Sequence, residues 1–272
     1  IGDPPNIMIG SAAGLSFADF VMVDAPAAII CLIVMIGLFY LLFGRKFKVD
    51  EEHRRALMER DEREEIKNPT LLRQSVIMII LVTAGFMLHG SLGIESCVVA
   101  LTAAGILMLI SGERIEEALA HVEWTTLVFF AGLFIVVGAL SEVGVIGMLA
   151  QALIDVTGGS TFIAMLVLLI ASAIISSFLD NIPFVATMIP ILLSMEATGM
   201  DVMPLWWAVS LGACLGGNGT LIGASANVVM SDISRKNGHV ITFAHFFKVG
   251  FPTMLATVAV SAIYLIVRFP PM

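Results

Sequence analysis

The sequence predicts an all-α polytopic membrane protein built on an inverted repeat, with a re-entrant hairpin, broken helices and a first repeat that is mostly missing. Of its 272 residues, 58% are hydrophobic and only 13% are charged, whereas a soluble domain carries about 25% charged residues. Several apolar runs approach the ~20 residues that span a bilayer. A motif at the start of the chain is nearly repeated close to its end, and internal repeats are a known feature of polytopic membrane folds.

The expected membrane spans are these apolar runs. They are Pro26–Phe43, Ser75–Gly93, Ser96–Ile110, Trp124–Leu140, Thr161–Phe178 and Val249–Val267. The third run is short for a span and has room to extend by a few residues at either end. Trp206 and Trp207 are expected at a membrane interface, where aromatic residues gather.

The basic residues predict the orientation of the chain. The segment 44–74 contains Arg45, Lys46, Lys48, Arg54, Arg55, Arg60, Arg63, Lys67 and Arg73, and no Lys or Arg occurs from Ile115 to Ser234. Because cytoplasmic loops are enriched in Lys and Arg, this segment is expected in the cytoplasm. Its acidic residues stand four positions before basic ones, as in Glu51 and Arg55, which favours a solvated linker helix over a regulatory or partner site.

Counting spans from this loop predicts the side of each remaining segment. Ser11–Ala25 and Val143–Ser160 are expected outside the cytoplasm, while Gly44–Gln74 and Ser231–Lys248 are expected within it. The last of these segments is again basic, in agreement with the same rule.

Two blocks of sequence recur along the chain. Ile1-Gly2 and Asn6 match Ile222-Gly223 and Asn227 at an offset of 221 residues (222 − 1), and Phe17–Pro26 resembles Phe243–Pro252 at an offset of 226 (243 − 17). Equivalent segments fall on opposite sides of the membrane in the span count, so the repeat is expected to be inverted. The chain opens within the motif and without an initiator Met, which indicates a fragment.

These positions divide the chain into three parts. Residues 1–43 are the end of a first repeat, with a broken helix and a last helix, and residues 44–74 are the charged linker. Residues 75–272 form the second inverted repeat, which includes a re-entrant hairpin at 161–199 and a broken helix at 203–232.

The hairpin is predicted from a polar stretch inside an apolar one. Asp180 and Asn181 follow two serines and precede Pro183. A charged Asp at the centre of a straight membrane helix is costly, and Pro183 weakens a helix there. Because irregular backbone at membrane depth is tolerated where protein or a wet cavity satisfies it, we expect Asp180 and Asn181 at the hairpin tip.

The broken helix is predicted from its glycine density. Gly212, Gly216, Gly217, Gly219 and Gly223 disfavour a continuous helix, with the break expected at Gly216–Thr220, and Asn218, Thr220, Ser225 and Asn227 supply polar groups. A broken helix leaves N–H groups at one end, which suit an anion or a neutral oxyacid, and C=O groups at the other, which suit a cation. Close helix packing by small residues is the alternative.

The start of the chain contains further candidates. Pro4 and Pro5 argue against a regular helix at membrane depth, and Asp3 is an ionisable group there. We therefore place Asp3 and Asn6 in the site, against the alternative that Asp3 caps the following half-helix. The residue equivalent to Asp3 in the second copy is Ala224, so the two copies are not expected to be equivalent in function.

Three motifs carry a resemblance to a known group of proteins. "IGDPPNIMIG", "SSFLDNIPFVATMIP" and "LGGNGTLIGASANVV" together resemble the ion transporter superfamily, and most of all its arsenite-exporter-like, citrate-transporter-like and P-protein-like permeases. The resemblance covers essentially the whole chain. It implies two inverted repeats and a site that includes Asp180, Asn181, Gly217, Asn218, Thr220, Asn227, Asp3 and Asn6, and it implies that the first hairpin is missing.

The leading functional hypothesis is a secondary active transporter of a small ion, oxyacid or carboxylate, such as arsenite or a citrate-like anion, coupled to H⁺ or Na⁺. A sodium/proton antiporter of the same superfamily is the alternative, and a channel is less favoured. The sequence contains no phosphate-binding G-x-x-x-x-G-K-[ST] motif. An intramembrane aspartyl protease is disfavoured because no PAL motif follows Gly2-Asp3, so we expect no enzymatic activity and no cofactor beyond the coupling ion.

Asp180 is expected to couple transport to a proton or cation, because a carboxylate at membrane depth is costly to ionise. Asn181 is assigned to ligand contact, and the alternative for Asp180 is a cap on the half-helix that begins near Pro183. Cys31, Cys97 and Cys214 lie apart in apolar runs, which favours packing over redox or metal roles. The expected partners are the substrate and the bilayer of the plasma (inner) membrane, with a homodimer left open and no nucleic acid.

Overall fold

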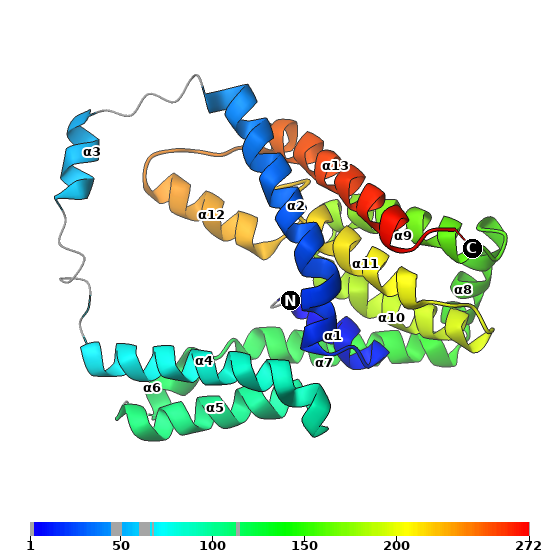
Figure 1. Cartoon of the computed structure of the whole chain (residues 1–272), viewed down its shortest axis with the longest axis horizontal. Coiled ribbons are helices and arrows are strands. Elements are labelled where there is room, and N and C mark those ends of the chain that lie inside the picture. The colour runs from blue at the N-terminus through cyan, green and yellow to red at the C-terminus, as the bar shows by residue number, and fades with distance from the viewer. Residues whose placement is uncertain (1–2, 45–50, 60–65, 67, 113–114, 272) are drawn as a thin grey trace. The chain divides into compact units, whose positions relative to one another are not determined.

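The computed structural model describes residues 3–44, 51–59, 66, 68–112 and 115–271, and every regular element in these ranges is an α-helix (Figure 1). The chain forms two compact units. Residues 1–15, 19–35 and 125–272 make up the larger unit, and residues 16–18 and 36–124 make up the smaller one. The expected linker 44–74 lies partly outside the described residues.

The smaller unit contains α3 (Glu51–Met58), α4 (Pro69–Leu92), α5 (Ser96–Ser111) and α6 (Ile115–Ala120). α4 and α5 pack against each other, and Gly93 ends α4 with a φ of 64° in the left-handed conformation that favours glycine. In α3, Arg54 pairs with Glu51 at 3.3 Å, which is an i,i+3 pair rather than the expected i,i+4 pair with Arg55.

The larger unit contains most of α2 (Phe17–Phe43) and eight further helices in the described residues. They are α1 (Pro4–Ala13), α7 (Trp124–Glu142), α8 (Val145–Val156), α9 (Thr161–Phe178), α10 (Asn181–Ala197), α11 (Met203–Gly216), α12 (Ser225–Lys236) and α13 (Phe243–Arg268). Among the described helices, 5 are long and apolar enough to cross a membrane, namely α2, α4, α7, α9 and α13. The prediction of an all-α polytopic membrane protein is therefore confirmed.

Two prolines lie inside membrane helices and not at their starts. The expected spans begin at Pro26 and Val249, but α2 begins at Phe17 and α13 at Phe243, with Pro26 and Pro252 in their interiors. The expected starts are therefore wrong, and residues 17–25 belong to α2. Proline removes one backbone donor and commonly kinks a helix, but packing in the folded protein can carry the helix through it.

The helix starts recur at the two offsets found in the sequence. α1 begins at Pro4 and α12 at Ser225, which are 221 residues apart (225 − 4). α2 begins at Phe17 and α13 at Phe243, which are 226 residues apart (243 − 17). The two blocks of similar sequence therefore form two similar pairs of helices.

The equivalent helices α2 and α13 run in opposite directions (Figure 1). The hydroxyl of Tyr264 donates to the carbonyl oxygen of Val23 at 2.7 Å, and the thiol of Cys31 donates to that of Thr257 at 3.5 Å. Residue numbers rise along α2 while those of the partners fall along α13. This opposition is the relationship expected between copies of an inverted repeat.

The core of the larger unit surrounds α11. Trp206 and Trp207 are each 2% exposed, and Trp207 meets Phe20 edge to face with ring centroids 5.2 Å apart. The expectation that these tryptophans mark a membrane interface is wrong, because nearly every side chain of α11 is buried by protein.

α9 lies beside α11 and runs in the same direction. Near their starts, the hydroxyl of Thr161 donates to the carbonyl oxygen of Asp201 at 3.1 Å. Near their ends, the hydroxyl of Ser176 donates to the carbonyl oxygen of Ala213 at 2.8 Å. α10 connects the two, so the tip between α9 and α10 lies at the level where α11 ends.

Two other segments of this unit, Val143–Ser160 and the end of α12, are expected on opposite sides of the membrane. The stretch Val143–Ser160 contains α8, which packs on α10 and buries Ile146 and Ala150. At the end of α12, Lys236 and Arg235 contact Asp232 at 2.8 and 2.6 Å, and these hydrogen bonds lower the pKa of the Asp232 carboxyl.

Candidate functional site

Residues 217–224 interrupt the helix between α11 and α12, an interruption longer than the expected one at Gly216–Thr220. The hydroxyl of Thr220 donates to the carbonyl oxygen of Ser177 in α9. The hydroxyl of Ser177 in turn donates to the carbonyl oxygen of Gly216 at 2.9 Å. Hydroxyl groups therefore satisfy carbonyl oxygens that the ends of α9 and α11 leave without helical donors.

Asn227 holds the interruption from its other side. Its Nδ2 donates to the carbonyl oxygens of Gly217 at 2.8 Å and Thr220 at 3.0 Å. One amide in the first turn of α12 thus supports two backbone carbonyls. Asn227 is a structural support of this loop, and its contact with a ligand stays a prediction.

Glycine allows the interrupted segment to lie directly against α9. A Cβ on Gly216 would lie 2.5 Å from the carbonyl oxygen of Ala173, and a Cβ on Gly219 would overlap the side chain of Ser177. Small residues permit such close approach of membrane helices. The alternative of helix packing therefore accounts for Gly216, which ends a helix and touches its neighbour.

At the tip between α9 and α10, the two polar residues expected there make different contacts. The carboxylate of Asp180 accepts a hydrogen bond from the backbone N–H of Ile182 at 3.0 Å and caps α10. Asn181 is buried, and its Nδ2 donates to Oδ2 of Asp3 at 3.0 Å. The capping alternative for Asp180 is thus realised geometrically, while its coupling role stays a prediction.

Asp3 immediately precedes α1, and Pro4 and Pro5 take the first two helical positions. The expectation that these prolines prevent a regular helix is wrong, because the first N–H groups of a helix have no helical partner in any case. The side chain of Asp3 makes no cap bond to α1. Its carboxylate instead accepts hydrogen bonds from Asn181 and from the thiol of Cys214 at 3.2 Å.

A carboxylate that sequence reasoning did not single out lies deeper in the same site. Asp24 of α2 is 6% exposed, and its Oδ2 lies 2.5 Å from Oγ of Ser210 in α11. The same Oγ lies 2.7 Å from Oδ1 of Asn6 in α1. Oδ1 of Asp24 is buried without a hydrogen-bond partner in the described part of the chain.

The internal repeat contained a signal for this residue. At the offset of 226, the residue equivalent to Asp24 is Gly250, just as Ala224 is equivalent to Asp3 at the offset of 221. Both positions carry an aspartate in the first copy and a small residue in the second. The difference between the two copies at these two positions is the sequence signal that points to Asp24.

The structure brings together some of the site residues that the sequence predicted. Asp3, Asn6 and Asn181 form one hydrogen-bonded cluster with the unexpected Asp24, Ser210 and Cys214. Gly217, Gly219, Thr220 and Asn227 form the interrupted segment beside α9. Asn218 and Ser225 are exposed, and no hydrogen bond joins either side chain to this cluster.

The cluster is acidic and lacks cationic side chains of its own. The N-termini of α1 and α10 meet here and carry partial positive charge, but no Lys or Arg occurs from Ile115 to Ser234. Pro4 and Pro5 further remove two N–H groups from the start of α1. Among the described residues, no three His, Cys, Asp or Glu side chains are grouped so as to hold a metal.

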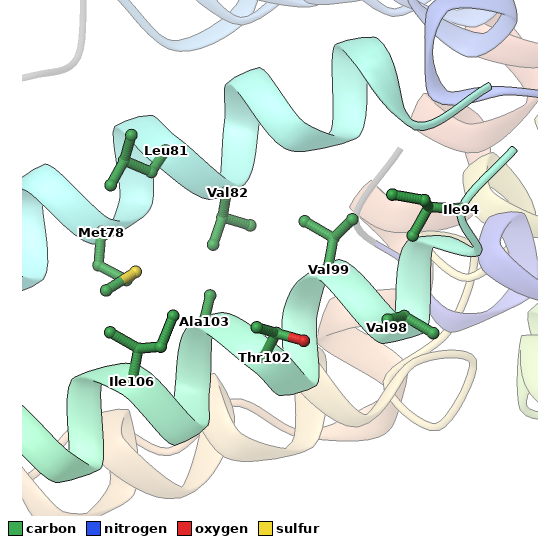
Figure 2. Close-up of a pocket in the computed structure, with 9 residues that line it drawn as sticks. All are labelled: Met78, Leu81, Val82, Ile94, Val98, Val99, Thr102, Ala103 and Ile106. Carbon is green, nitrogen blue, oxygen red and sulfur yellow. The ribbon is translucent and has the colours of Figure 1, made fainter. Parts of the chain in front are cut away.

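A different, apolar cleft lies in the smaller unit between α4 and α5 (Figure 2). It encloses about 340 Å³ and is lined by side chains that include Met78, Val82, Val99, Thr102 and Ile106. Figure 2 shows side chains from the two helices facing each other across this space. Thr102 supplies its only labelled side-chain oxygen, so the cleft has no carboxylate or amide for ion chemistry.

Apolar helices with a polar, interrupted centre define a multi-pass integral membrane protein. Comparison with known families gives the same class, because residues 1–212 match the citrate transporter family. The chain belongs to this family. The resemblance to the ion transporter superfamily is thereby confirmed.

Several relatives cover nearly the whole chain. An uncharacterised transporter of Mycobacterium tuberculosis is 44% identical over 273 residues, which are 99% of this chain and 63% of that protein. An uncharacterised transporter of Synechocystis is 30% identical over 287 residues, or 97% of this chain and 63% of that protein. The P protein of Sus scrofa is 38% identical over 230 residues, or 80% of this chain and 27% of that protein. The chain thus spans less than two thirds of the length of these relatives.

Proposed function

We propose that the complete protein is a secondary active transporter of a small carboxylate or oxyacid, such as a citrate-like anion or arsenite, coupled to H⁺ or Na⁺ in the plasma membrane. The observation that carries this proposal is the 3.0 Å hydrogen bond from Asn181 to Asp3. It joins the tip between α9 and α10 to the start of α1, two segments that the sequence assigns to different repeats. Transporters of inverted-repeat design bind their substrates at such a junction, between discontinuous helices.

The charge of the cluster supports coupling to a cation. Asp3 and Asp24 lie in a site without a cationic side chain, so a free anion entering it would face like charge. A proton or Na⁺ that enters with the anion removes this repulsion, whereas neutral arsenite needs no such compensation. The amide of Asn181 and the N-termini of α1 and α10 can then hold the oxygen atoms of the substrate.

A sodium/proton antiporter is the second candidate, and the same acidic cluster favours it. The two aspartates of the cluster and the amide oxygen of Asn6 offer hard oxygen ligands for Na⁺. In that case Na⁺ and H⁺ would compete for one site, and no organic or arsenical substrate would be needed.

The test uses the full-length protein in proteoliposomes. Uptake of labelled citrate, arsenite and Na⁺ is measured separately, each with and without an imposed pH gradient and each with an ionophore control. Accumulation of citrate or arsenite against its own gradient supports the first proposal, and proton-driven accumulation of Na⁺ alone supports the second. Downhill flux that never becomes accumulation would indicate a channel and overturn both.

A further inference from the structure

Ser210 is required to make two hydrogen bonds with one proton. Its Oγ lies 2.7 Å from Oδ1 of Asn6 and 2.5 Å from Oδ2 of Asp24. A hydroxyl has a single O–H donor, and both a carboxylate and an amide oxygen are acceptors only. One of the two contacts therefore needs a proton from another group.

Two arrangements of protons satisfy all three side chains. If Asp24 is protonated, its O–H donates to Ser210 and Ser210 donates to Oδ1 of Asn6. If Asp24 is ionised, Ser210 donates to the carboxylate, and the amide of Asn6 must turn over so that Nδ2 donates to Ser210. With Oδ1 of Asn6 facing Ser210, as in the structure, the missing proton has to come from Asp24.

We propose that Asp24 carries the proton exchanged during transport and that Ser210 passes its protonation state to the amide of Asn6. This inference deepens the proposed function and rests on it. Release of the proton to water leaves a carboxylate at Asp24 and reverses the amide of Asn6. The amide of Asn6 then presents its NH₂ group to the substrate site before proton release and its oxygen after it. Substrate binding is thereby linked to the protonation of Asp24.

The surroundings of Asp24 favour this role. The titratable groups near it are Cys214 of α11 and Tyr264 of α13, with Asp3 reached through Cys214. None of these three is a cation, so none of them compensates a buried negative charge on Asp24. Only Oδ2 of Asp24 makes a hydrogen bond, and Oδ1 has no partner among the described residues.

Asp180 is less suited to the same task. Its carboxylate is half-buried and accepts the N–H of Ile182 as the cap of α10. Asparagine would make the same cap. Among the described residues, no side chain makes a hydrogen bond to Asp180 whose direction would depend on its protonation, as that of Ser210 does for Asp24.

The first test is independent of substrate. Infrared difference spectra of the full-length protein in lipid nanodiscs are recorded between high and low pH. The C=O band of protonated carboxyls, identified by its shift in D₂O, should be lost at high pH in the wild type, and the component that belongs to Asp24 should be missing from this band in Asp24→Asn. Asp19→Asn, which removes an exposed carboxylate from the same helix, should keep the band. A band with the same shape and area in Asp24→Asn as in the wild type overturns the assignment.

The second test measures coupling. With an imposed gradient of one pH unit, the wild type should accumulate substrate about tenfold for each coupled proton, with citrate and arsenite as probes. Asp24→Asn should lose this accumulation, because asparagine can neither take up nor release the exchanged proton. Ser210→Ala should keep the infrared band and lose accumulation.

The outcomes separate the two proposals. Accumulation at the wild-type level in Asp24→Asn overturns the proton assignment, and the same result in Ser210→Ala overturns the relay to Asn6. If the wild type transports neither probe, the proposed function fails while the infrared result still decides the protonation of Asp24. Thermal unfolding midpoints equal to that of the wild type confirm that the variants are folded.

Discussion

Asn181 donates a hydrogen bond to Asp3 at 3.0 Å across 178 positions of sequence. Asn181 is the first residue of α10, and Asp3 is the cap residue of α1. The carboxylate therefore lies between two helix N-termini, whose partial positive charges it can offset. This arrangement explains how two helix N-termini can lie side by side.

An exchange of charge tests this contact. Asn181→Asp alone should place two carboxylates at hydrogen-bond distance and destabilise the fold, while Asp3→Asn alone should lose the charged acceptor. The double variant Asp3→Asn/Asn181→Asp restores one amide and one carboxylate. We expect a coupling free energy of about 1–3 kcal/mol from the four unfolding curves in detergent. Additive effects would show that the two side chains do not interact.

The cap at Asp180 makes a second prediction. Asp180→Ala should lower the free energy of unfolding by about 1 kcal/mol, whereas Asp180→Asn should change it by only a few tenths, because asparagine also caps well. If the exchanged proton resides on Asp24, Asp180→Asn should also keep gradient-driven uptake. Loss of that uptake in a stable Asp180→Asn protein would return the coupling role to Asp180.

The approach of α11 to α9 makes a third prediction. Gly216→Ala should destabilise the protein by about 1–3 kcal/mol, because the new methyl group would press on the backbone of Ala173. Gly147 of α8 has nothing within 4 Å of its would-be Cβ and provides the matched control. Gly147→Ala should be neutral or stabilising by up to about 1 kcal/mol. Equal unfolding midpoints for the two variants would contradict close packing at Gly216.

The support of the interrupted segment by Asn227 makes a fourth prediction. Asn227→Ala removes the side-chain donor to the carbonyl oxygens of Gly217 and Thr220, of which Thr220 keeps the N–H of Gly223, and should cost about 1–3 kcal/mol. Asn237→Ala is the control, because it removes an exposed amide that bonds only to Ile233 of the same helix. That change should stay within about 0.5 kcal/mol. Hydrogen exchange of residues 217–224 should rise in the first variant and not in the second.

The expected topology makes a fifth prediction. In a variant without native cysteines, a single cysteine at Asp155 in α8 should react with a membrane-impermeant reagent added from outside. A single cysteine at Arg55 in α3 should react only after the membrane is permeabilised, because the basic segment 44–74 is expected in the cytoplasm. Both side chains are exposed in the structure, so burial would not explain a missing reaction. The reverse pattern would invert the orientation.

Hydropathy and composition predicted most of the fold. The apolar runs became helices, and the glycine-rich stretch became the interruption between α11 and α12. Local rules failed where packing decides the outcome, as at Pro26, which α2 passes through, and at Trp206, which protein buries. An apolar run has the same composition whether lipid or protein surrounds it, so the sequence did not distinguish the two.

The candidate site was predictable only in part, for a related reason. Asp3, Asn6 and Asn181 lie in motifs that break a helix, and this irregularity marks them in the sequence. Asp24 lies inside a continuous apolar helix, and its partner Ser210 is 186 positions away. Only the fold brings these two side chains together, although comparison of the two repeat copies would have drawn attention to Asp24.

The substitution of glycine for aspartate between the two copies has a consequence for stoichiometry. At the register of Asp24, the opposite copy has Gly250, whose would-be Cβ position lies 2.6 Å from the backbone oxygen of Asn218. No acidic side chain fits there without displacing that loop. If Asp24 carries the exchanged proton as proposed, its counterpart Gly250 adds no second one, so we expect these two positions to contribute one proton, and not two, to each transport cycle.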